Sequence, residues 1–303
     1  MVKYKTEPDK IVPGVSKSIH AFRLDHEQSH NNIDPEVVRS FGDEWEKFES
    51  FEQEDLERTA AMYFDILAEK HLNKNTYAMD MGCGTGRWTK MIADKVDFVE
   101  AVDPSSAIFV ADRLLKNTPN VRLTQASVDT LPFEDDTFDF VMSIGVLHHI
   151  PDTQKAMSDC VSKVKRGGFF YTYLYYSLDN RGFFFRLLFA ASNLVRMLVS
   201  KLPAGVKKFV CDVLAILFYM PFVWLGRLFK MMGLKKLAAK LPLSIYQEQP
   251  FYIIRNDSLD RFGTKLEQRF SKKQVEEMMI KAGLHEIIVS PGMPYWHAVG
   301  TKL

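Results

Sequence analysis

The sequence has few cysteines, and their positions match no known framework. Cys83, Cys160 and Cys211 are odd in number and far apart in the 303 residues, which argues against a disulfide scaffold and against a zinc site. Free thiols are typical of a reducing cytosol. The opening segment, MVKYKTEPDKIVPG, also lacks the apolar run of a secretory signal. We therefore expect a cytoplasmic protein without a metal site.

A net charge of one dominant sign is missing as well, because two oppositely charged regions cancel. The chain sums to +1, yet residues 181–240 contain eleven Lys and Arg side chains and a single acid, Asp212. Residues 25–69 contain fourteen acids and three basic side chains. A split of this kind predicts a basic surface that meets an acidic partner or a membrane.

Uncharged stretches long enough to cross a membrane are absent from the basic region. Its longest uncharged core, residues 213–226, has 14 residues, whereas a helical span needs about 20. The sequence therefore predicts no transmembrane helix. Basic flanks beside an apolar face are instead typical of a helix at a membrane surface, which would place the protein peripherally at the inner face of an anionic membrane. A soluble helical lid over a hydrophobic acceptor is the alternative.

Residues 177–266 form an insert with helical patterns throughout. Helices are expected at 183–200, 206–232 and 234–241, the second of them interrupted by Pro221. In the first helix the polar side chains form one narrow stripe, while almost all others are Phe, Leu, Val, Met or Ala. The stripe consists of Arg186, Asn193, Arg196 and Ser200. We expect this insert to be a cap that covers the acceptor site and touches a membrane.

The N-terminal 72 residues are expected to form an arm and helices that pack on the domain or act as a lid. Residues 1–33 are polar and irregular, which predicts a mobile arm. The arm contains three histidines whose spacing matches no metal-ligand pattern, His20, His26 and His30. Asp34 followed by Pro35 predicts a helix start, and residues 54–72 have the pattern of an amphipathic helix.

Short apolar runs alternate with helical patterns in the rest of the chain. Strands are expected at 77–81, 98–102, 121–125, 138–143 and 169–175, and helices at 87–95, 107–116 and 153–164. After the insert, a helix at 272–282 precedes strands at 284–290 and 295–301. Such alternation predicts βαβ units around a parallel sheet. The last two strands are expected to pair as an antiparallel hairpin.

The first of these strands ends in a glycine-rich turn. Residues 80–86 are Asp-Met-Gly-Cys-Gly-Thr-Gly, and a helical pattern begins at Arg87. Glycines allow a tight turn and a close approach of the backbone to a ligand, and the N–H groups of the next helix then face that ligand. In the dinucleotide fingerprint G-x-G-x-x-G two residues separate the second and third glycines, whereas one residue separates them in this turn. An ordinary βα turn is the alternative.

This turn resembles the first motif of class I S-adenosylmethionine (SAM)-dependent methyltransferases. The stretch Leu131-Pro132-Phe133 with Phe138-Asp139, and the segment 144–149 (IGVLHH), resemble the branch related to ubiquinone and menaquinone biosynthesis. The resemblance covers about 77–176 and 267–303. It implies a SAM-binding core at 73–176 and 267–303. The implied fold is α/β, with a Rossmann-like, seven-stranded, mostly parallel sheet, a C-terminal antiparallel hairpin, and the insert between the fifth strand and the last helix.

Candidate cofactor residues lie at the carboxyl ends of the strands, where a doubly wound sheet binds its ligand. Asp103 would accept hydrogen bonds from the ribose hydroxyls, although capping the next helix is its alternative role. Ser127 and Val128 would flank the adenine, where related enzymes often have an Asp. The other expected contacts with S-adenosyl-L-methionine are Asp80, Gly82, Cys83, Gly84, Gly86, Pro104 and Ile144.

Two adjacent histidines are the candidate catalytic residues. If the methyl acceptor is a hydroxyl, a general base assists the transfer, and histidine titrates near neutrality. His148 and His149 follow the fourth strand, and the alternative is that one of them packs against or caps the next helix. Tyr173, Tyr175 and Tyr176 close the fifth strand and line the acceptor site or belong to the core.

The sequence favours a methyltransferase that acts on a hydrophobic small molecule or a lipid or glycolipid, on oxygen. A nucleic-acid methyltransferase is one alternative, but the basic insert has little Asn, Gln or Gly, and the Asn/Asp-Pro-Pro-Tyr tetrad of amino-methylating enzymes is missing. We therefore expect no nucleic-acid partner. A non-catalytic SAM-binding partner protein is the other alternative.

Overall fold

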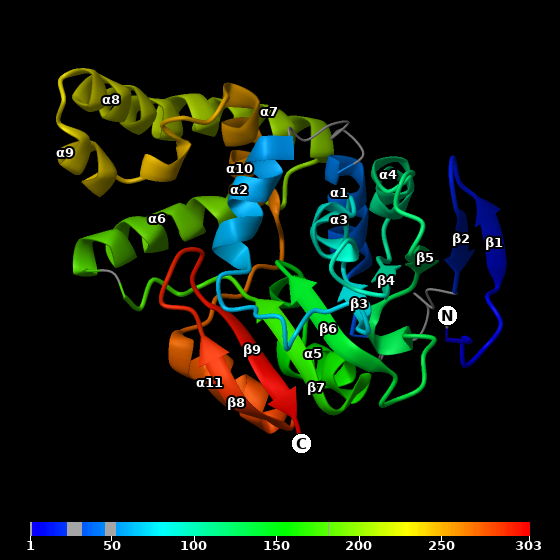
Figure 1. Cartoon of the computed structure of the whole chain (residues 1–303). Coiled ribbons are helices and arrows are strands. Elements are labelled where there is room, and N and C mark those ends of the chain that lie inside the picture. Colours follow the sequence, from blue (N-terminus) through cyan, green and yellow to red (C-terminus); the bar gives the residue numbers. More distant parts are fainter. Residues whose placement is uncertain (1, 23–31, 46–52, 181) are drawn as a thin grey trace. The chain divides into compact units, whose positions relative to one another are not determined.

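The computed structural model describes residues 2–22, 32–45, 53–180 and 182–303 (Figure 1). The chain divides into two compact units. The first, Met1–Asp179 with Leu266–Leu303, is called the sheet unit here, and the second, Asn180–Lys265, the helical unit. The helical unit corresponds to the insert expected at 177–266. The residues described between 2 and 72 belong to the sheet unit.

The sheet unit is built on nine strands in the order β1-β2-β5-β4-β3-β6-β7-β9-β8. The strands are β1 (Lys10–Pro13), β2 (Ser18–Ala21), β3 (Tyr77–Met81), β4 (Phe98–Val102), β5 (Val121–Gln125), β6 (Phe138–Ile144), β7 (Val164–Tyr173), β8 (Leu284–Val289) and β9 (His297–Lys302). The strands β2 to β7 pair in parallel, and β8, β9 and β7 pair antiparallel. This confirms the mostly parallel α/β sheet and its antiparallel end.

Helices cover both faces of this sheet. Alternate residues of β3 point to opposite faces, so Ala78 packs in one core cluster and Met79 in the other. The first cluster includes residues of α2 (Gln53–Tyr63), α3 (Arg87–Ala93) and α4 (Ala107–Leu114), and the second residues of α5 (Thr153–Ser162) and α11 (Lys272–Lys281). All five residues of β3 are buried, which explains why the strand has no alternation of polar and apolar residues and is apolar apart from Asp80.

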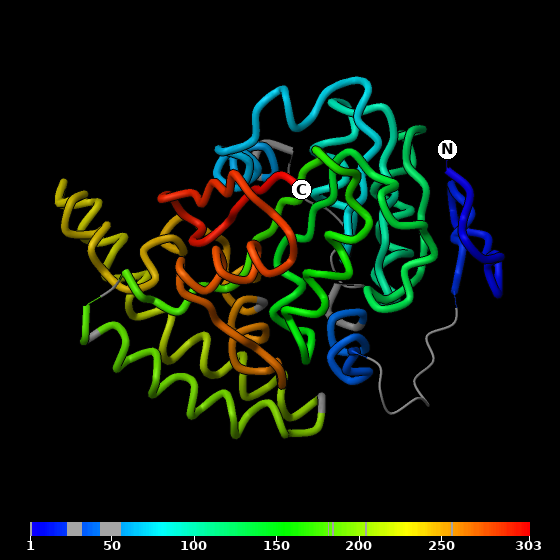
Figure 2. The backbone as a smooth tube through the Cα atoms, turned by 90° about the horizontal axis from the view of Figure 1, so that it is seen from below, coloured from blue at the N-terminus to red at the C-terminus, as the bar shows by residue number. Residues whose placement is uncertain are grey.

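The expectation of a mobile N-terminal arm was wrong for the described part of residues 1–33. Strands β1 and β2 form a hairpin that pairs with β5 and brings the sheet to nine strands where seven were expected. Both views place this hairpin at the end of the sheet opposite to β8 and β9 (Figures 1 and 2). The Asp112 carboxylate accepts hydrogen bonds from the backbone N–H groups of Val15, Ser16 and Lys17. His26 and His30 lie outside the described residues.

Of the two N-terminal helices, one begins where the sequence predicted and the other ends earlier than its pattern suggested. Helix α1 (Pro35–Trp45) begins as predicted, since the Asp34 carboxylate accepts hydrogen bonds from the N–H groups of Glu36 and Val37. Helix α2 ends at Tyr63, nine residues before the expected end at 72. The chain turns there, and the ring of His71 accepts from Ala68 N–H in a local cap that competes with further helix.

The helical unit contains α6 (Phe183–Val199), α7 (Ala204–Leu214), the π-helical segment η3 (Ala215–Tyr219), α8 (Met220–Met231), α9 (Lys235–Lys240), η4 (Ser244–Tyr246) and α10 (Phe251–Gly263). Its core joins α6, α7, η3, α8 and α10. The interruption expected at Pro221 takes the form of the π-helical segment η3, and Gly205–Met231 stays helical throughout. The π-helical turn precedes the proline, which sits in the first turn of α8, where a missing N–H costs least.

Candidate functional site

The glycine turn between β3 and α3 has a backbone that only glycine adopts easily. Gly82, Gly84 and Gly86 all have positive φ angles, +79°, +53° and +80°. A Cβ atom on Gly82 would lie 2.4 Å from a Val146 methyl, so this glycine permits close packing inside the protein. A Cβ atom on Gly84 would meet nothing within 4 Å. The turn is therefore open at Gly84, where a ligand can approach the backbone.

Asp103 ties this turn to the end of β4. Its carboxylate accepts from Gly84 N–H at 2.9 Å on one oxygen, and from the N–H and hydroxyl of Ser105 at 2.8 and 2.6 Å on the other. Burial raises the pKa of Asp103, and the three hydrogen bonds oppose that rise. The next residue, Pro104, has no N–H to compete. The structure thus brings Asp103 to the open glycine, and its contact with a ribose stays a prediction.

Three buried polar atoms around the same turn have no hydrogen-bond partner among the described residues. They are Asp80 Oδ1, Thr85 Oγ1 and Trp88 Nε1. The other Asp80 oxygen accepts from the Thr89 hydroxyl at 2.6 Å, and burial raises the pKa of Asp80 to about 7. Such unsatisfied groups are costly, so their gathering at one turn indicates a site that a polar ligand completes.

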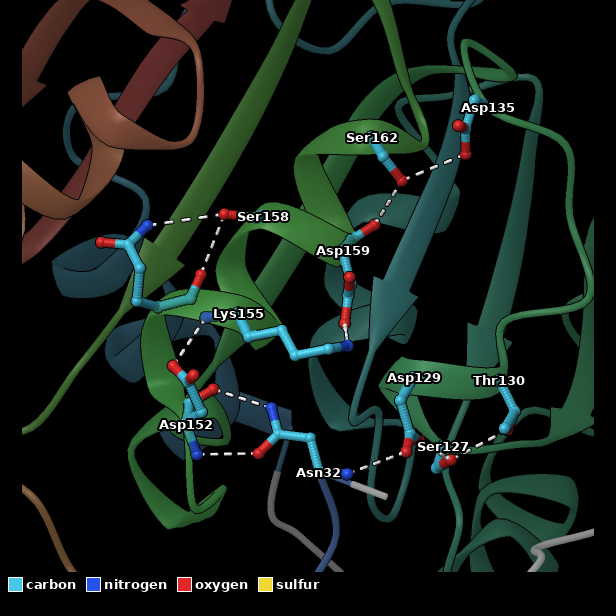
Figure 3. Close-up of polar contacts among 11 residues, drawn as sticks. Asn32, Ser127, Asp129, Thr130, Asp135, Asp152, Lys155, Ser158, Asp159 and Ser162 are labelled. Carbon is cyan, nitrogen blue, oxygen red and sulfur yellow. Dashed lines mark hydrogen bonds and ion pairs between the residues drawn. The ribbon is translucent and has the colours of Figure 1, made fainter. Parts of the chain in front are cut away.

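The end of β5 differs from what was expected of an adenine contact. Ser127 donates its hydroxyl to Asp129, and Asp129 also accepts from Asn32 N–H at 3.0 Å (Figure 3). The Asn32 side chain in turn pairs with the backbone of Asp152 at 2.8 and 2.7 Å. Ser127 is therefore engaged inside the protein. Val128 is buried in the same core cluster as Met79, and its contact with a cofactor stays a prediction.

Cys83 and Ile144 are both buried next to the turn. Burial raises the pKa of the Cys83 thiol well above its usual value, so the side chain acts as a small apolar group rather than as a nucleophile. Ile144 ends β6 and packs in the core cluster of α3 and α4. Both residues are placed to limit the shape of the ligand site, and their contacts with a cofactor stay predictions.

The paired histidines lie just beyond β6, in the short helix η2 (Leu147–His149). The ring of His148 is fully buried, stacks on Tyr175 at 3.9 Å, and has no hydrogen-bond partner on either nitrogen among the described residues. Burial lowers the pKa of His148 well below its usual value, with smaller contributions from His149 and Arg269. The ring is therefore neutral at pH 7, and both of its nitrogens keep their hydrogen-bonding capacity.

His149 is held by a different contact. Its Nδ1 lies 2.8 Å from the carbonyl of Leu266, so this nitrogen carries the proton and Nε2 is the acceptor in the neutral ring. The Phe41 ring of α1 packs on it at 4.7 Å. The two histidines are thus not equivalent, because a protein carbonyl fixes the tautomer of His149 and leaves that of His148 undetermined.

Sequence reasoning missed the segment that supports the histidines, residues 266–270. Gln268 N–H donates to the carbonyl of His148 at 3.0 Å, and its side-chain amide donates to the carbonyl of Ile150 at 2.8 Å. The Arg269 guanidinium lies over the Tyr175 ring at 5.0 Å and donates to Glu267 at 2.7 Å. The only sequence signal was the return of the α/β pattern near Arg269.

A second group of aromatic rings borders the glycine turn. The Tyr63 ring, at the end of α2, packs on Trp88 at 4.7 Å and on Tyr173 at 5.1 Å. Just beyond Tyr63, Asp65 binds the buried His297 of β9 at 2.6 Å. These contacts bring the ends of α2, β7 and β9 together. The acidic residues and histidines described do not form a group of three that could hold a metal ion.

The chain resembles known proteins mainly over this sheet. Residues 79–172 match the family described as "Methyltransferase domain". The chain is 30% identical over 129 residues to the demethylmenaquinone methyltransferase of Staphylococcus carnosus, covering 39% of this chain and 49% of that protein. It is 24% identical over 160 residues to the ubiquinone biosynthesis O-methyltransferase of Coxiella burnetii, covering 51% and 66%. The chain thus spans about half to two thirds of these relatives.

Among solved structures, one similar chain comes from the complex between the Haloferax volcanii Trm112 methyltransferase activator and a putative methyltransferase. Its identity to this chain is 14%, with a TM-score of 0.49 over 89% of this chain and 99% of that one.

Proposed function

Because the chain carries a class I SAM-dependent methyltransferase domain, we propose that it transfers a methyl group from S-adenosyl-L-methionine to an oxygen of a hydrophobic small molecule or lipid. The observation that carries the proposal is the open glycine turn joined to Asp103, with two histidines beyond the neighbouring strand. Both named relatives act in quinone biosynthesis by their names, which supports an acceptor of similar chemistry.

The residues around the turn fit the proposed cofactor. Open space at Gly84 leaves room for a ligand against the backbone, and Asp103 offers a carboxylate that already accepts from that glycine. Asp80 and Trp88 offer one unsatisfied acceptor and one unsatisfied donor, which match a ligand that carries both an ammonium and a carboxylate. When bound, this cofactor supplies an electrophilic methyl group on a sulfonium.

In this proposal the two histidines act on the methyl acceptor. The neutral His148 ring has a nitrogen lone pair that can accept a hydrogen bond from the acceptor hydroxyl and then take its proton. A lowered pKa makes the ring a weaker base, so orientation of the hydroxyl contributes more here than proton affinity. His149, with Nε2 as its acceptor atom, is the second candidate. Their buried surroundings exclude water from the oxygen to be methylated.

The experiment that tests this function is transfer of label from methyl-labelled SAM. The purified chain is offered demethylated quinone precursors, total lipid extract and total RNA from a bacterial host in separate reactions. We expect label in a chloroform-soluble product and none in RNA. Label in RNA would favour a nucleic-acid methyltransferase. SAM binding without transfer to any fraction would favour a non-catalytic partner protein.

The role of His148 at the methyl acceptor can be tested with a matched pair of variants. His148→Ala removes the proposed hydrogen bond at the acceptor, whereas His285→Ala removes a histidine of β8 on a strand at the far edge of the sheet. Loss of labelled product in the first variant and retention in the second supports the proposed site. Equal activity of both variants contradicts it.

A further inference from the structure

We propose that the helical unit docks in the plane of an anionic membrane surface, through the outward faces of α6 and of the helix Gly205–Met231. The inference concerns a surface remote in sequence from the glycine turn and does not depend on methyl transfer. It rests on three observations in the helical unit: the apolar faces left outside, the polar groups placed inside, and the excess of basic side chains.

The helix Gly205–Met231 is apolar on both faces. Its inner face packs in the core of the helical unit through Cys211, Ala215, Tyr219 and Val223, which are all buried. Its outer face carries large apolar side chains at the same helical spacing, and these are about half exposed or more. The outer residues are Phe209, Leu217, Trp224, Leu228 and Met231. A soluble helix would have polar side chains on this outer face.

In helix α6, polar side chains point into the helical unit and large apolar side chains point outward. Arg196 is buried and donates to the carbonyls of Thr264 and Lys265 at 2.9 Å each, so the polar stripe predicted from the sequence lies partly inside the unit. The Ser192 hydroxyl likewise accepts from Arg261 of α10 at 2.9 Å. The outward side chains of α6 include Phe183, Leu187, Leu194 and Leu198, of which Phe183 is 75% exposed.

Exposed apolar side chains are concentrated in this unit. Of the 29 large apolar side chains that are exposed among the described residues, 21 lie between Phe183 and Tyr252. Monomeric soluble proteins rarely expose a contiguous apolar surface of this kind, and such surfaces mark contacts with proteins or membranes. The charges decide between these two partners.

Basic side chains accompany the apolar faces. Residues 181–240 hold eleven Lys and Arg and one acid, and that acid, Asp212, is bound by Arg255 at 2.8 Å. The exposed lysines are Lys201, Lys208, Lys235, Lys236 and Lys240. Apolar faces flanked by lysines fit an anionic lipid surface, where each basic side chain raises binding about fivefold.

Length and composition alone would allow Gly205–Met231 to cross a membrane, whereas the short uncharged core predicted no transmembrane helix. Its packing argues for an in-plane position. The inner face is bound to α10, since Tyr219 donates to Asp257 at 2.9 Å and Ser258 donates to the Cys211 carbonyl at 2.7 Å. A spanning helix would break these contacts or bring the charges of α10 into hydrocarbon.

The test is sedimentation of the full chain with vesicles of phosphatidylcholine, with and without 40% phosphatidylglycerol, at low and high salt. We expect binding to the anionic vesicles at least tenfold tighter than to the neutral ones, and weaker at high salt. The variant Leu217→Ser/Trp224→Ser/Leu228→Ser should bind at least 100-fold more weakly. The variant Lys201→Gln/Lys235→Gln/Lys236→Gln/Lys240→Gln should lose the preference for anionic lipid.

A matched control removes exposed apolar side chains from the sheet unit, Val15→Ser/Ile280→Ser/Ile288→Ser, and should bind within twofold of the parent. Circular dichroism establishes that each variant is folded. Equal loss in control and test variants contradicts the proposed face. Absence of binding to every vesicle contradicts the membrane, and if the parent is then a dimer that Leu217→Ser/Trp224→Ser/Leu228→Ser dissociates, the face binds a second copy.

The depth of the helix separates the two orientations. Fluorescence quenching by brominated lipids is measured for the parent chain and for Trp224→Phe, and the difference reports Trp224 alone. Stronger quenching by bromines near the headgroups is expected for a helix in the plane of the surface. Stronger quenching by bromines near the chain ends would show a spanning helix and would overturn the in-plane proposal.

Discussion

Single residues at the glycine turn and beyond β6 are buried with polar atoms that lack a partner among the described residues. Asp80 is fully buried with one oxygen unsatisfied, and His148 is buried with both ring nitrogens unsatisfied among the described residues. Each unsatisfied group costs about 1–3 kcal/mol. Residues that weaken the fold and gather at one edge of the sheet are expected at functional sites.

The Asp80 carboxyl gives a prediction about pH. Burial raises its pKa from 3.8 to about 7 in the folded chain, so the folded state binds the proton more tightly than the unfolded state. The free energy of unfolding should therefore fall as pH rises from about 4 to 7. Asp80→Asn should remove this slope and stabilise the ligand-free chain at pH 8 by on the order of 2–4 kcal/mol.

Urea unfolding of the parent and Asp80→Asn at several pH values checks this prediction. Asp159→Asn, on the surface of α5, serves as the control because its carboxylate is partly exposed and paired with Lys155. An unchanged slope in Asp80→Asn would contradict the account of the buried carboxyl.

Asp103 gives a prediction about affinity. Asp103→Ala removes a carboxylate that would accept hydrogen bonds from the ribose, and it also frees Gly84 N–H. Loss of charged hydrogen bonds of about 1.5–3 kcal/mol each should weaken SAM binding by one to two orders of magnitude. Isothermal titration calorimetry measures the change. Parent-like affinity would remove Asp103 from the cofactor site.

His148 gives a prediction about turnover. His148→Ala should lower kcat by about 100-fold or more if the ring takes the proton, while the Kd of SAM changes little. In the parent, the lowered pKa keeps His148 neutral as pH falls through the usual imidazole range. Protonation of His148 should therefore not lower activity as the pH falls just below 6.5. A lost affinity for SAM would instead make His148 a cofactor contact.

At the scale of elements, the N-terminal hairpin shows how a distant residue can create strands. Strands β1 and β2 have only four residues each, and β1 ends in a proline, so their sequence gives little strand signal. The Asp112 carboxylate of α4 accepts hydrogen bonds from the N–H groups of the hairpin turn, and Ile19 is fully buried beside β5. Asp112 is about 95 residues away in the sequence, and no local pattern could reveal that contact.

Asp112→Ala should therefore loosen the hairpin and leave the rest of the sheet intact. The change removes the acceptor of three backbone N–H groups, and we expect a loss of about 1–3 kcal/mol. Hydrogen exchange should accelerate at Ile19 and Ala21 and stay slow at Met79 in β3. Equal acceleration in both strands would show global destabilisation instead.

Elements with a continuous local pattern were predictable from the sequence. The limits of β3, β4 and β5 coincide with the strands expected at 77–81, 98–102 and 121–125, because each segment is short, rich in apolar or β-branched residues and followed by a turn or loop. The glycine turn, Asp103 and the histidines were also found. The supports around His148 were not, because Gln268 and Arg269 are about 120 residues further along the chain.

At the scale of the whole molecule, the chain joins a sheet unit with a ligand site to a basic helical unit with apolar outward faces. The expectation that the helical unit caps the acceptor site stays a prediction. A methyl acceptor dissolved in a membrane would suit both units. Binding of SAM at the open glycine turn, in contrast, depends on the sheet unit alone.

The most direct test of that claim is calorimetric titration of SAM into the parent chain, Gly84→Ala and Gly167→Ala. Both glycines have positive φ angles and open space at the Cβ position, so both substitutions strain the backbone similarly, by about 1–2 kcal/mol. Only Gly84 lies at the proposed site. We predict 1:1 binding to the parent and Gly167→Ala, and affinity at least tenfold weaker for Gly84→Ala. Equal affinity of all three chains, or no binding to the parent, would contradict the account.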